Sequence, residues 1–283
     1  MQSWLRHNPA PKESDLLNIA RALLTAQPEM APLIRLANEI ALATDQRDPR
    51  EALARSLSGF LSVLKTASGR IAPHFSQRLR RKWNGNKWDL MTYSYSSTVL
   101  KAIRRARNRI GIVWCSEGRP ALEGRRTAQA VAGMGLPVYF TTDAALPYSV
   151  CIAEALVLGA DSIQQYLNTI CFENKVGSNA LVESARFFKT PVWILADTTK
   201  LLPLALVRLG SQEKEKPIRE VWAGAPKGVS VWNYYFESFP YAKGLDVLTE
   251  RGWLSYAQLL HALASIRVSR RMKELMNGQP AVA

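Results

Sequence analysis

The sequence predicts an α/β fold, in which a small all-helical N-terminal domain precedes a larger domain built on a mostly parallel sheet. Apolar residues recur at helical spacing over residues 14–70, whereas short β-branched runs alternate with helical stretches farther along the chain. A polar patch at residues 78–87 separates the two patterns. We therefore place a helical domain at residues 1–85 and a sheet domain at residues 86–283.

The helical domain is predicted from three apolar stripes. A break at residues 27–29 separates the first two stripes, and Asp48-Pro49 is a typical helix start before the third. The stripes indicate a packed core and carry no evident chemistry. They consist of Leu16, Leu17, Ala20, Leu23 and Leu24, then Leu33, Ile34, Ala37, Ile40 and Ala41, and finally Leu53, Leu57, Phe60, Leu61 and Leu64.

The sheet domain is predicted from strands that alternate with helices. This order is typical of parallel βαβ units, whose ligands bind at the carboxyl ends of the strands. No glycine-rich nucleotide fingerprint follows any predicted strand. The predicted strands span residues 109–114, 136–141, 155–159 and 191–195; the helices span residues 97–108, 119–134 and 177–188; and an exposed loop is expected at residues 210–228.

The chain is strongly basic, with a formal net charge of +14. Its basic clusters, at residues 78–82 and 101–109, suit either an anionic partner or a solvated helix face. Neither cluster alternates with aromatic residues, and no nucleic-acid-binding motif is evident. Direct nucleic-acid binding is therefore a possibility without sequence support.

Composition also limits the compartment and the cofactors. Three cysteines at unrelated spacings and three scattered histidines indicate neither a disulfide framework nor a metal site, and we expect no cofactor. No apolar run is long enough to cross a bilayer, and the polar N-terminus lacks the apolar stretch of a signal peptide. We expect a cytoplasmic protein with no membrane association.

Polar groups follow the predicted strands, where a ligand would bind. Hydroxyls at a helix start suit a phosphate but also serve as ordinary caps. A strand-end carboxylate can act as an acid or a base, or can simply cap a helix or pair with a lysine. The segments are T-Y-S-Y-S-S-T at 92–98, E-G-R-P at 117–120, T-D-A-A at 142–145, G-A-D at 159–161, N-K-V-G-S at 174–178, and Lys200.

These segments, taken in order, resemble the initiation factor 2B α/β/δ regulatory subunit family. The resemblance covers roughly residues 90–260 and includes the closing elements N-Y-Y-F-E-S-F-P at 233–240 and T-E-R-G at 249–252. The family also contains methylthioribose-1-phosphate isomerase and ribose-1,5-bisphosphate isomerase. The resemblance implies a Rossmann-like sheet domain, a helical N-terminal domain, and association into dimers or higher oligomers.

The resemblance also implies the site residues. Asp161 takes the position of the proton donor, and Ser94 takes the position where the isomerases have a cysteine as proton acceptor. Tyr93 replaces the histidine that precedes it, and the segment 164–173 is about three residues longer than usual. The residues implied to hold the ligand and its phosphate are Ser96, Ser97, Thr98, Arg119, Asn174, Lys175 and Lys200.

The serine at position 94 leaves two functions open. A serine hydroxyl is far less acidic than a thiol and needs a neighbouring base, so it cannot take over the role of a thiolate unaided. One interpretation is a divergent, non-catalytic protein that binds a sugar phosphate or a nucleoside monophosphate. The alternative is an active aldose–ketose isomerase of a ribose 1-phosphate derivative with an altered base. Cys115 lies at another strand end, where a buried structural cysteine is the simpler reading.

The aromatic C-terminal segment is ambiguous in the same way. Its side chains can supply an association surface or can belong to the core. They are Trp222, Trp232, Tyr234, Tyr235 and Phe236.

Overall fold

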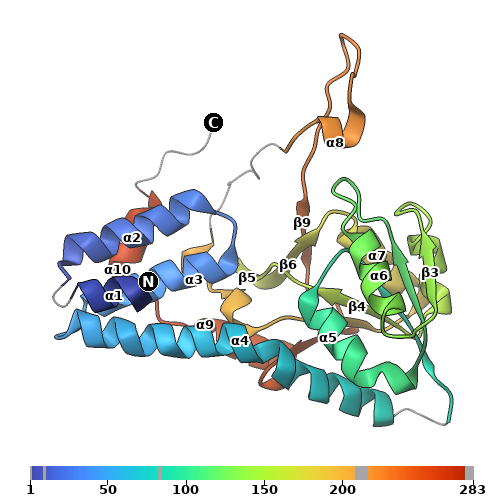
Figure 1. Ribbon diagram of the computed structural model, residues 1–283, viewed down its shortest axis with the longest axis horizontal. Coiled ribbons are helices and arrows are strands. Elements are labelled where there is room, and N and C mark those ends of the chain that lie inside the picture. The colour runs from blue at the N-terminus through green and yellow to red at the C-terminus, as the bar shows by residue number, and fades with distance from the viewer. Residues whose placement is uncertain (1, 9–10, 82–84, 208–215, 278–283) are drawn as a thin grey trace.

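The computed structural model describes residues 2–8, 11–81, 85–207 and 216–277 (Figure 1). It confirms an α/β fold with a helical region at the N-terminus. The helices of that region pack beside one end of a sheet domain, and one long helix runs beneath both (Figure 1). No helix in the described ranges has the length and apolarity needed to cross a membrane.

The helical part contains α1 Gln2–His7, α2 Glu13–Ala26, α3 Ala31–Thr44 and α4 Pro49–Arg81. The predicted stripes face inward, and Leu16, Leu24 and Ile40 are completely buried. The C-terminal helix α10, Arg270–Asn277, packs on α3, so the end of the described chain joins this core.

Helix α4 extends through the first residues of the polar patch where the sequence predicted a boundary. Phe75 and Leu79 are completely buried against the sheet domain, so the apolar face of the helix continues past residue 70. Arg78 pairs with Asp246 at 2.5 Å and lies over the ring of Trp253 at 4.1 Å. Part of the first basic cluster therefore joins the two regions. Residues 82–84 of the patch lie outside the described residues.

The main sheet has seven strands in the order β11-β10-β7-β4-β1-β2-β3. All neighbouring strands are parallel except β10 and β11. The predicted strands correspond to β2, β3, β4 and β7, and the sequence analysis did not identify the other three. The strands are β1 Trp88–Thr92, β2 Ile110–Ser116, β3 Val138–Thr141, β4 Ala155–Gly159, β7 Val192–Leu195, β10 Leu245–Thr249 and β11 Gly252–Leu254.

Helices α5 Ser97–Ala106, α6 Gly124–Ala132, α7 Ser178–Phe188 and α9 Tyr256–Ala264 accompany this sheet. Helix α6 begins five residues later than predicted. Residues 117–122 instead form a turn, in which the backbone N–H groups of Gly118 and Arg119 donate to the Asp143 carboxylate at 2.9 and 2.6 Å. The first residue of the helix, Gly124, has to be a glycine, because a Cβ at that position would lie 1.8 Å from the Ser116 carbonyl oxygen.

A second sheet has the strand order β8-β5-β6-β9. Its antiparallel β5–β6 hairpin accommodates the segment 164–173 that is longer than the family pattern. The strands are β5 Ser162–Tyr166, β6 Thr169–Lys175, β8 Leu201–Leu202 and β9 Phe236–Pro240, and the short turns are η1 Arg107–Arg109, η2 Pro147–Ile152, η3 Thr198–Lys200 and η4 Leu204–Leu206.

The segment 216–235, here called the arm, projects from the body of the protein and carries the short helix α8, Arg219–Trp222 (Figure 1). Trp222 and Trp232 are 51% and 82% exposed. These two tryptophans belong to the surface rather than the core of the described chain. Of the predicted loop at 210–228, residues 210–215 lie outside the described residues.

Candidate functional site

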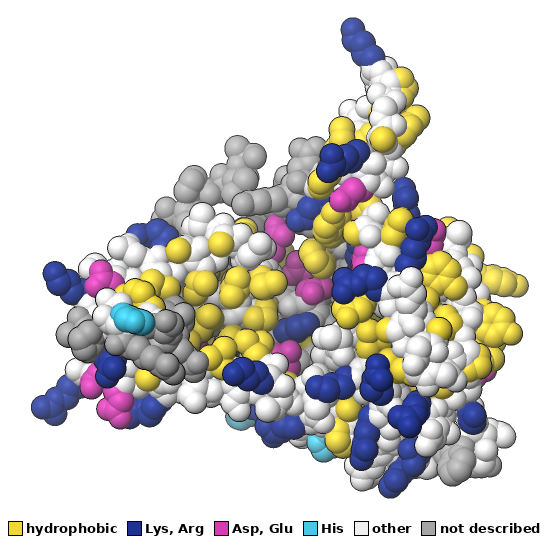
Figure 2. All heavy atoms as spheres, viewed as in Figure 1, with side chains coloured by type: hydrophobic (Ala, Val, Ile, Leu, Met, Phe, Trp, Pro, Cys, Tyr) yellow, Lys and Arg dark blue, Asp and Glu magenta, His cyan; other side chains and the backbone are white. Residues whose placement is uncertain are grey.

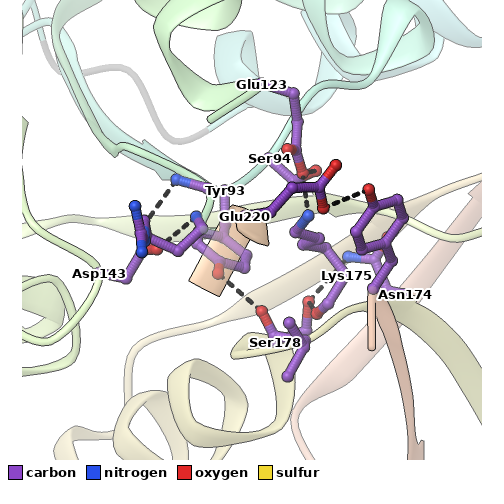
Figure 3. Close-up of polar contacts among 12 residues, drawn as sticks. Tyr93, Ser94, Glu123, Asp143, Asn174, Lys175, Ser178 and Glu220 are labelled. Carbon is purple, nitrogen blue, oxygen red and sulfur yellow. Dashed lines mark hydrogen bonds and ion pairs between the residues drawn. The ribbon is translucent and has the colours of Figure 1, made fainter. Parts of the chain in front are cut away.

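The carboxyl ends of β1, β2 and β4 bring most of the predicted polar segments together, beside the end of β6 (Figure 3). We call this group of side chains the strand-end site. Acidic and basic side chains gather in the hollow between the helical part and the sheet domain (Figure 2).

A buried ion pair lies at the centre of the strand-end site. Lys175 Nζ lies 2.9 Å from Glu123 Oε1, and their side chains are only 4% and 18% exposed. The Ser94 hydroxyl donates to the same carboxylate oxygen at 2.8 Å. The other oxygen, Oε2, is buried and has no hydrogen-bond partner among the described residues. The site thus offers a carboxylate oxygen that still requires a donor.

Ser94 is held in an unusual backbone conformation. Its φ of 63° lies in the left-handed region, which non-glycine residues seldom adopt. The Thr127 hydroxyl fixes this turn by donating to the Ser94 carbonyl at 2.6 Å. Such strained residues occur preferentially where the surrounding structure must aim a side chain. Here the turn directs the Ser94 hydroxyl at Glu123.

Tyr93 packs against the start of α7. Its hydroxyl donates to the Val176 carbonyl at 2.6 Å, and a Cβ on Gly177 would come within 2.7 Å of that hydroxyl oxygen. Burial, reinforced by the charges of Asp143, Glu123 and Glu237, raises the pKa of Tyr93. The tyrosine therefore stays a neutral donor and does not replace a titrating histidine.

Asp161 follows β4 and keeps solvent access, yet desolvation by the surrounding protein raises the pKa of its carboxyl group. The charges of Lys200 and Lys175 oppose this shift, and the charge of Glu123 adds to it. The Lys200 ammonium donates to the Ala160 carbonyl next to Asp161. A carboxyl group with a raised pKa can retain or donate a proton under conditions where an ordinary aspartate cannot.

Asn174 and the start of α7 are already paired within the protein. The Asn174 amide donates to Ser178 Oγ at 3.0 Å, and Ser178 in turn donates to the Lys175 carbonyl at 2.6 Å. The backbone N–H groups of Gly177 and Asn179 both donate to Glu237 Oε1, at 2.8 and 2.7 Å. The carboxylate of Glu237 thus occupies the anion position at this helix N-terminus.

The predicted phosphate hydroxyls lie at the start of α5. Ser96 caps the helix, since its Oγ accepts from Val99 N at 3.4 Å. Gly159 permits its approach to β4, because a Cβ there would lie 2.8 Å from Ser96 Oγ. Ser97 is exposed and Thr98 is half-buried.

Arg119, a predicted phosphate ligand, and Cys115, which was expected to be structural, both lie apart from the buried ion pair. Arg119 is exposed, and its guanidinium donates to the Val221 carbonyl of the arm at 3.2 Å. Cys115 is buried, and burial raises the pKa of its thiol to about 12, so it is a structural cysteine rather than a second nucleophile.

Two carboxylates beside the lysines were missed in the sequence. Glu123 lies within the E-G-R-P-A-L-E-G segment, where its position gave no indication of an inward direction. Glu220 comes from the arm, and its hydrogen bond from the Tyr235 hydroxyl at 2.5 Å lowers the pKa of its carboxyl group, with a smaller lowering from Lys175. The described residues contain no group of three His, Cys, Asp or Glu side chains that could hold a metal ion.

The relatives of the chain include both enzymes and translation factors. It is 26% identical to the ribose 1,5-bisphosphate isomerase of Archaeoglobus fulgidus over 243 residues, covering 82% of this chain and 74% of the relative. It is also 26% identical to a putative translation initiation factor eIF-2B subunit 2-like protein of Pyrococcus furiosus over 242 residues, covering 85% and 81%.

Solved structures show the same fold. The translation initiation factor eIF-2B of Pyrococcus horikoshii superposes with a TM-score of 0.68 at 24% identity, covering 89% of this chain and 87% of that one. The 5-methylthioribose 1-phosphate isomerase of the same organism gives a TM-score of 0.59 at 18% identity, covering 89% and 88%. Residues 11–255 match the Initiation factor 2 subunit family, and the chain therefore belongs to that family.

Proposed function

We propose that the strand-end site binds a small phosphorylated sugar or a nucleoside monophosphate without converting it. The observation that carries this proposal is the buried Lys175–Glu123 pair, whose free Oε2 atom calls for a donor such as a sugar hydroxyl. The hydroxyls of Ser96, Ser97 and Thr98, with Lys200, would receive the phosphate. Binding without turnover is favoured because the Ser94 hydroxyl is far less acidic than a thiol and does not readily form an anion that could accept a proton.

Thermal unfolding in the presence of candidate ligands tests this proposal. Ribose 1-phosphate, ribose 5-phosphate and AMP would be compared with ribose and with inorganic phosphate. A true ligand at 100 times its Kd stabilises the folded protein by about 2.7 kcal/mol. The substitution Asp161→Asn is expected to keep part of this stabilisation. Absence of any stabilisation by the phosphorylated sugars and nucleotides would overturn the proposal.

A second candidate function is an active aldose–ketose isomerase, an intramolecular oxidoreductase. The specific observation in its favour is the 2.8 Å bond from Ser94 to Glu123, which supplies the serine with the neighbouring base that it needs. Asp161, with its raised pKa, would serve as the acid. NMR detection of a ketose product from ribose 1-phosphate or ribose 1,5-bisphosphate tests this candidate. Glu123→Gln and Asp161→Asn would then each abolish turnover, whereas binding alone leaves the aldose unchanged.

We further propose that the protein self-associates through its arm. The exposed Trp222 and Trp232 are the kind of aromatic side chain that anchors protein interfaces. One structurally similar protein is a tetrameric eIF2B-β2δ2 complex from Chaetomium thermophilum. Light scattering should show a dimer or a larger species, and Trp222→Ser with Trp232→Ser should dissociate it. Phe187→Ser is a matched control, because this exposed aromatic lies on α7 outside the arm.

A further inference from the structure

A separate cavity of about 240 Å3 lies between α3, η3, the turn after β10 and the segment that follows α9. It includes Arg251 of the T-E-R-G segment, to which the proposed function assigns no role. We call it the arginine cavity. Its charged and hydroxyl-bearing walls are Arg35, Glu39, Thr198, Arg251, Ser265 and Arg267.

The charges of this cavity do not balance. Three arginines and one glutamate line the cavity, which leaves a formal excess of two positive charges among its lining residues. That carboxylate, Glu39, lies 3.9 Å from Arg35 and also accepts a hydrogen bond from the Ser56 hydroxyl at 2.5 Å. Within the described chain, the guanidinium groups of Arg251 and Arg267 form neither a salt bridge nor a hydrogen bond. Two arginine forks are therefore available to a ligand.

Arg35 is the least exposed of the three arginines. Its side chain is 14% exposed, Nη1 donates to the Leu201 carbonyl at 2.9 Å, and Nε is buried without a partner among the described residues. Burial lowers the pKa of Arg35, and the positive charge of Arg251 lowers it further against the opposing effect of Glu39. An anion between these groups would offset the repulsion and the desolvation together.

Buried hydrogen bonds hold two of the segments that form the cavity, at Thr198 and at residues 267–269. The buried Glu250 carboxylate accepts both the backbone N–H of Thr198, at 3.1 Å, and the Thr198 hydroxyl. The buried Asn38 side chain donates to the Arg267 carbonyl at 2.9 Å and accepts from Ser269 N at 3.1 Å. Such preorganisation lowers the entropic cost of binding a small ligand.

We propose that the arginine cavity is a second anion site, which binds the phosphate group of inorganic phosphate or of a small phosphorylated metabolite. A phosphate anion matches the positive excess of the lining residues, which the buried Glu250 carboxylate behind Thr198 offsets only in part, and its oxygens match the fork geometry of arginine. Thr198 and Ser265 would add hydroxyl donors. The volume suits phosphate or a short-chain phosphate ester and is below the range of drug-sized ligand pockets, so a nucleotide would not fit inside.

Calorimetric titration with inorganic phosphate, at constant ionic strength against chloride, tests the proposal. We expect saturable binding that weakens at least tenfold in the double variant Arg251→Gln/Arg267→Gln. Arg104→Gln/Arg105→Gln removes the same charge from the exposed face of α5 and should leave the affinity within twofold. Absence of saturable binding, or an equal loss in both variants, would overturn the proposal.

Two further experiments distinguish the two sites and the two possible sources of phosphate. Asp161→Asn/Lys200→Gln alters the strand-end site and should leave the binding of inorganic phosphate unchanged. If that variant abolishes phosphate binding while the arginine variant does not, the anion belongs to the strand-end site and the cavity proposal fails. Glycerol 3-phosphate binding more tightly than inorganic phosphate would identify a metabolite as the ligand, and the reverse order would identify the free ion.

Discussion

The strand-end site and the arginine cavity lie along the same edge of the main sheet, but they treat positive charge in opposite ways. In the strand-end site, Lys175 is paired with Glu123. The Asp161 carboxyl group there interacts with the charges of both Lys175 and Lys200. In the arginine cavity, Arg251 and Arg267 have no acidic partner among the described residues. A count of cations therefore does not locate an anion site, because internal carboxylates can neutralise them. The neutralised Lys175–Glu123 pair suits the sugar hydroxyls of a ligand, and the unbalanced arginine cavity suits a phosphate group alone.

The largest expected effect comes from breaking the buried pair. Lys175→Met would leave the Glu123 carboxylate buried without its cation, which should destabilise the protein by about 3 kcal/mol. Urea unfolding measures this loss. Lys65→Met removes an exposed lysine from α4 and should cost less than about 0.5 kcal/mol. A loss below about 1 kcal/mol for Lys175→Met would show that the pair is not a buried unit.

The turn η3 contributes to both sites, because Lys200 belongs to the strand-end site and Thr198 lines the arginine cavity. The next effect tests how this turn is held. Thr198→Val removes a hydroxyl from the buried Glu250 carboxylate and should cost about 2 kcal/mol of unfolding free energy. Thr66→Val is the control, because that exposed hydroxyl bonds only to a carbonyl of its own helix. Equal effects for the two variants would mean that Glu250 does not hold the turn.

The pH dependence of stability tests the strand-end carboxyl group. The pKa of Asp161 is higher in the folded state than the ordinary value of 3.8. The stability contributed by protonated Asp161 is therefore fully present below pH 3.8 and is lost as the pH rises through the folded-state pKa. Asp161→Asn removes this loss. The variant should be more stable than the wild type at neutral pH, by less than about 1 kcal/mol because the side chain is solvent-accessible, and the difference should vanish at low pH. An opposite sign would show that the lysines outweigh desolvation.

The smallest expected effect concerns the excess positive charge of the arginine cavity. Without phosphate, Arg251→Gln relieves repulsion with Arg35 and should raise the unfolding free energy by less than about 0.5 kcal/mol. With saturating phosphate, the wild type should become the more stable protein. Thermal unfolding with and without phosphate measures this reversal, and a variant that responds to phosphate as the wild type does would contradict it.

Sequence reasoning identified the parallel core because its strands are continuous apolar runs. Strands β2, β3, β4 and β7 have this pattern, which is expected of a sheet covered on both faces. Strand β1 contains Asp89, which bonds to the backbone of the neighbouring strand, and the β5–β6 hairpin mixes polar and apolar residues. These strands therefore lacked the continuous apolar run by which the other strands were predicted. The polar patch hid the last turns of α4, since charged residues flank the buried Leu79 on one continuous helix.

The ordered motifs located part of the strand-end site, because they follow strands whose ends must meet. They predicted that Ser94, Asp161 and Lys175 share one region. In the structure, Ser94 and Lys175 both contact Glu123 Oε1, and the charge of Lys175 acts on Asp161. They could not show that Glu123 points inward, since that depends on the turn around Arg119. The arginine cavity was beyond reach, because its walls come from four segments whose proximity only the folded chain reveals.

The left-handed backbone at Ser94 limits which residues this position can accept. Threonine and valine would be strained there, because β-branched side chains rarely tolerate a positive φ. Serine, cysteine, asparagine and glycine meet the backbone requirement more easily. Substitutions at this position are therefore restricted by the conformation of the backbone as well as by the chemistry of the side chain.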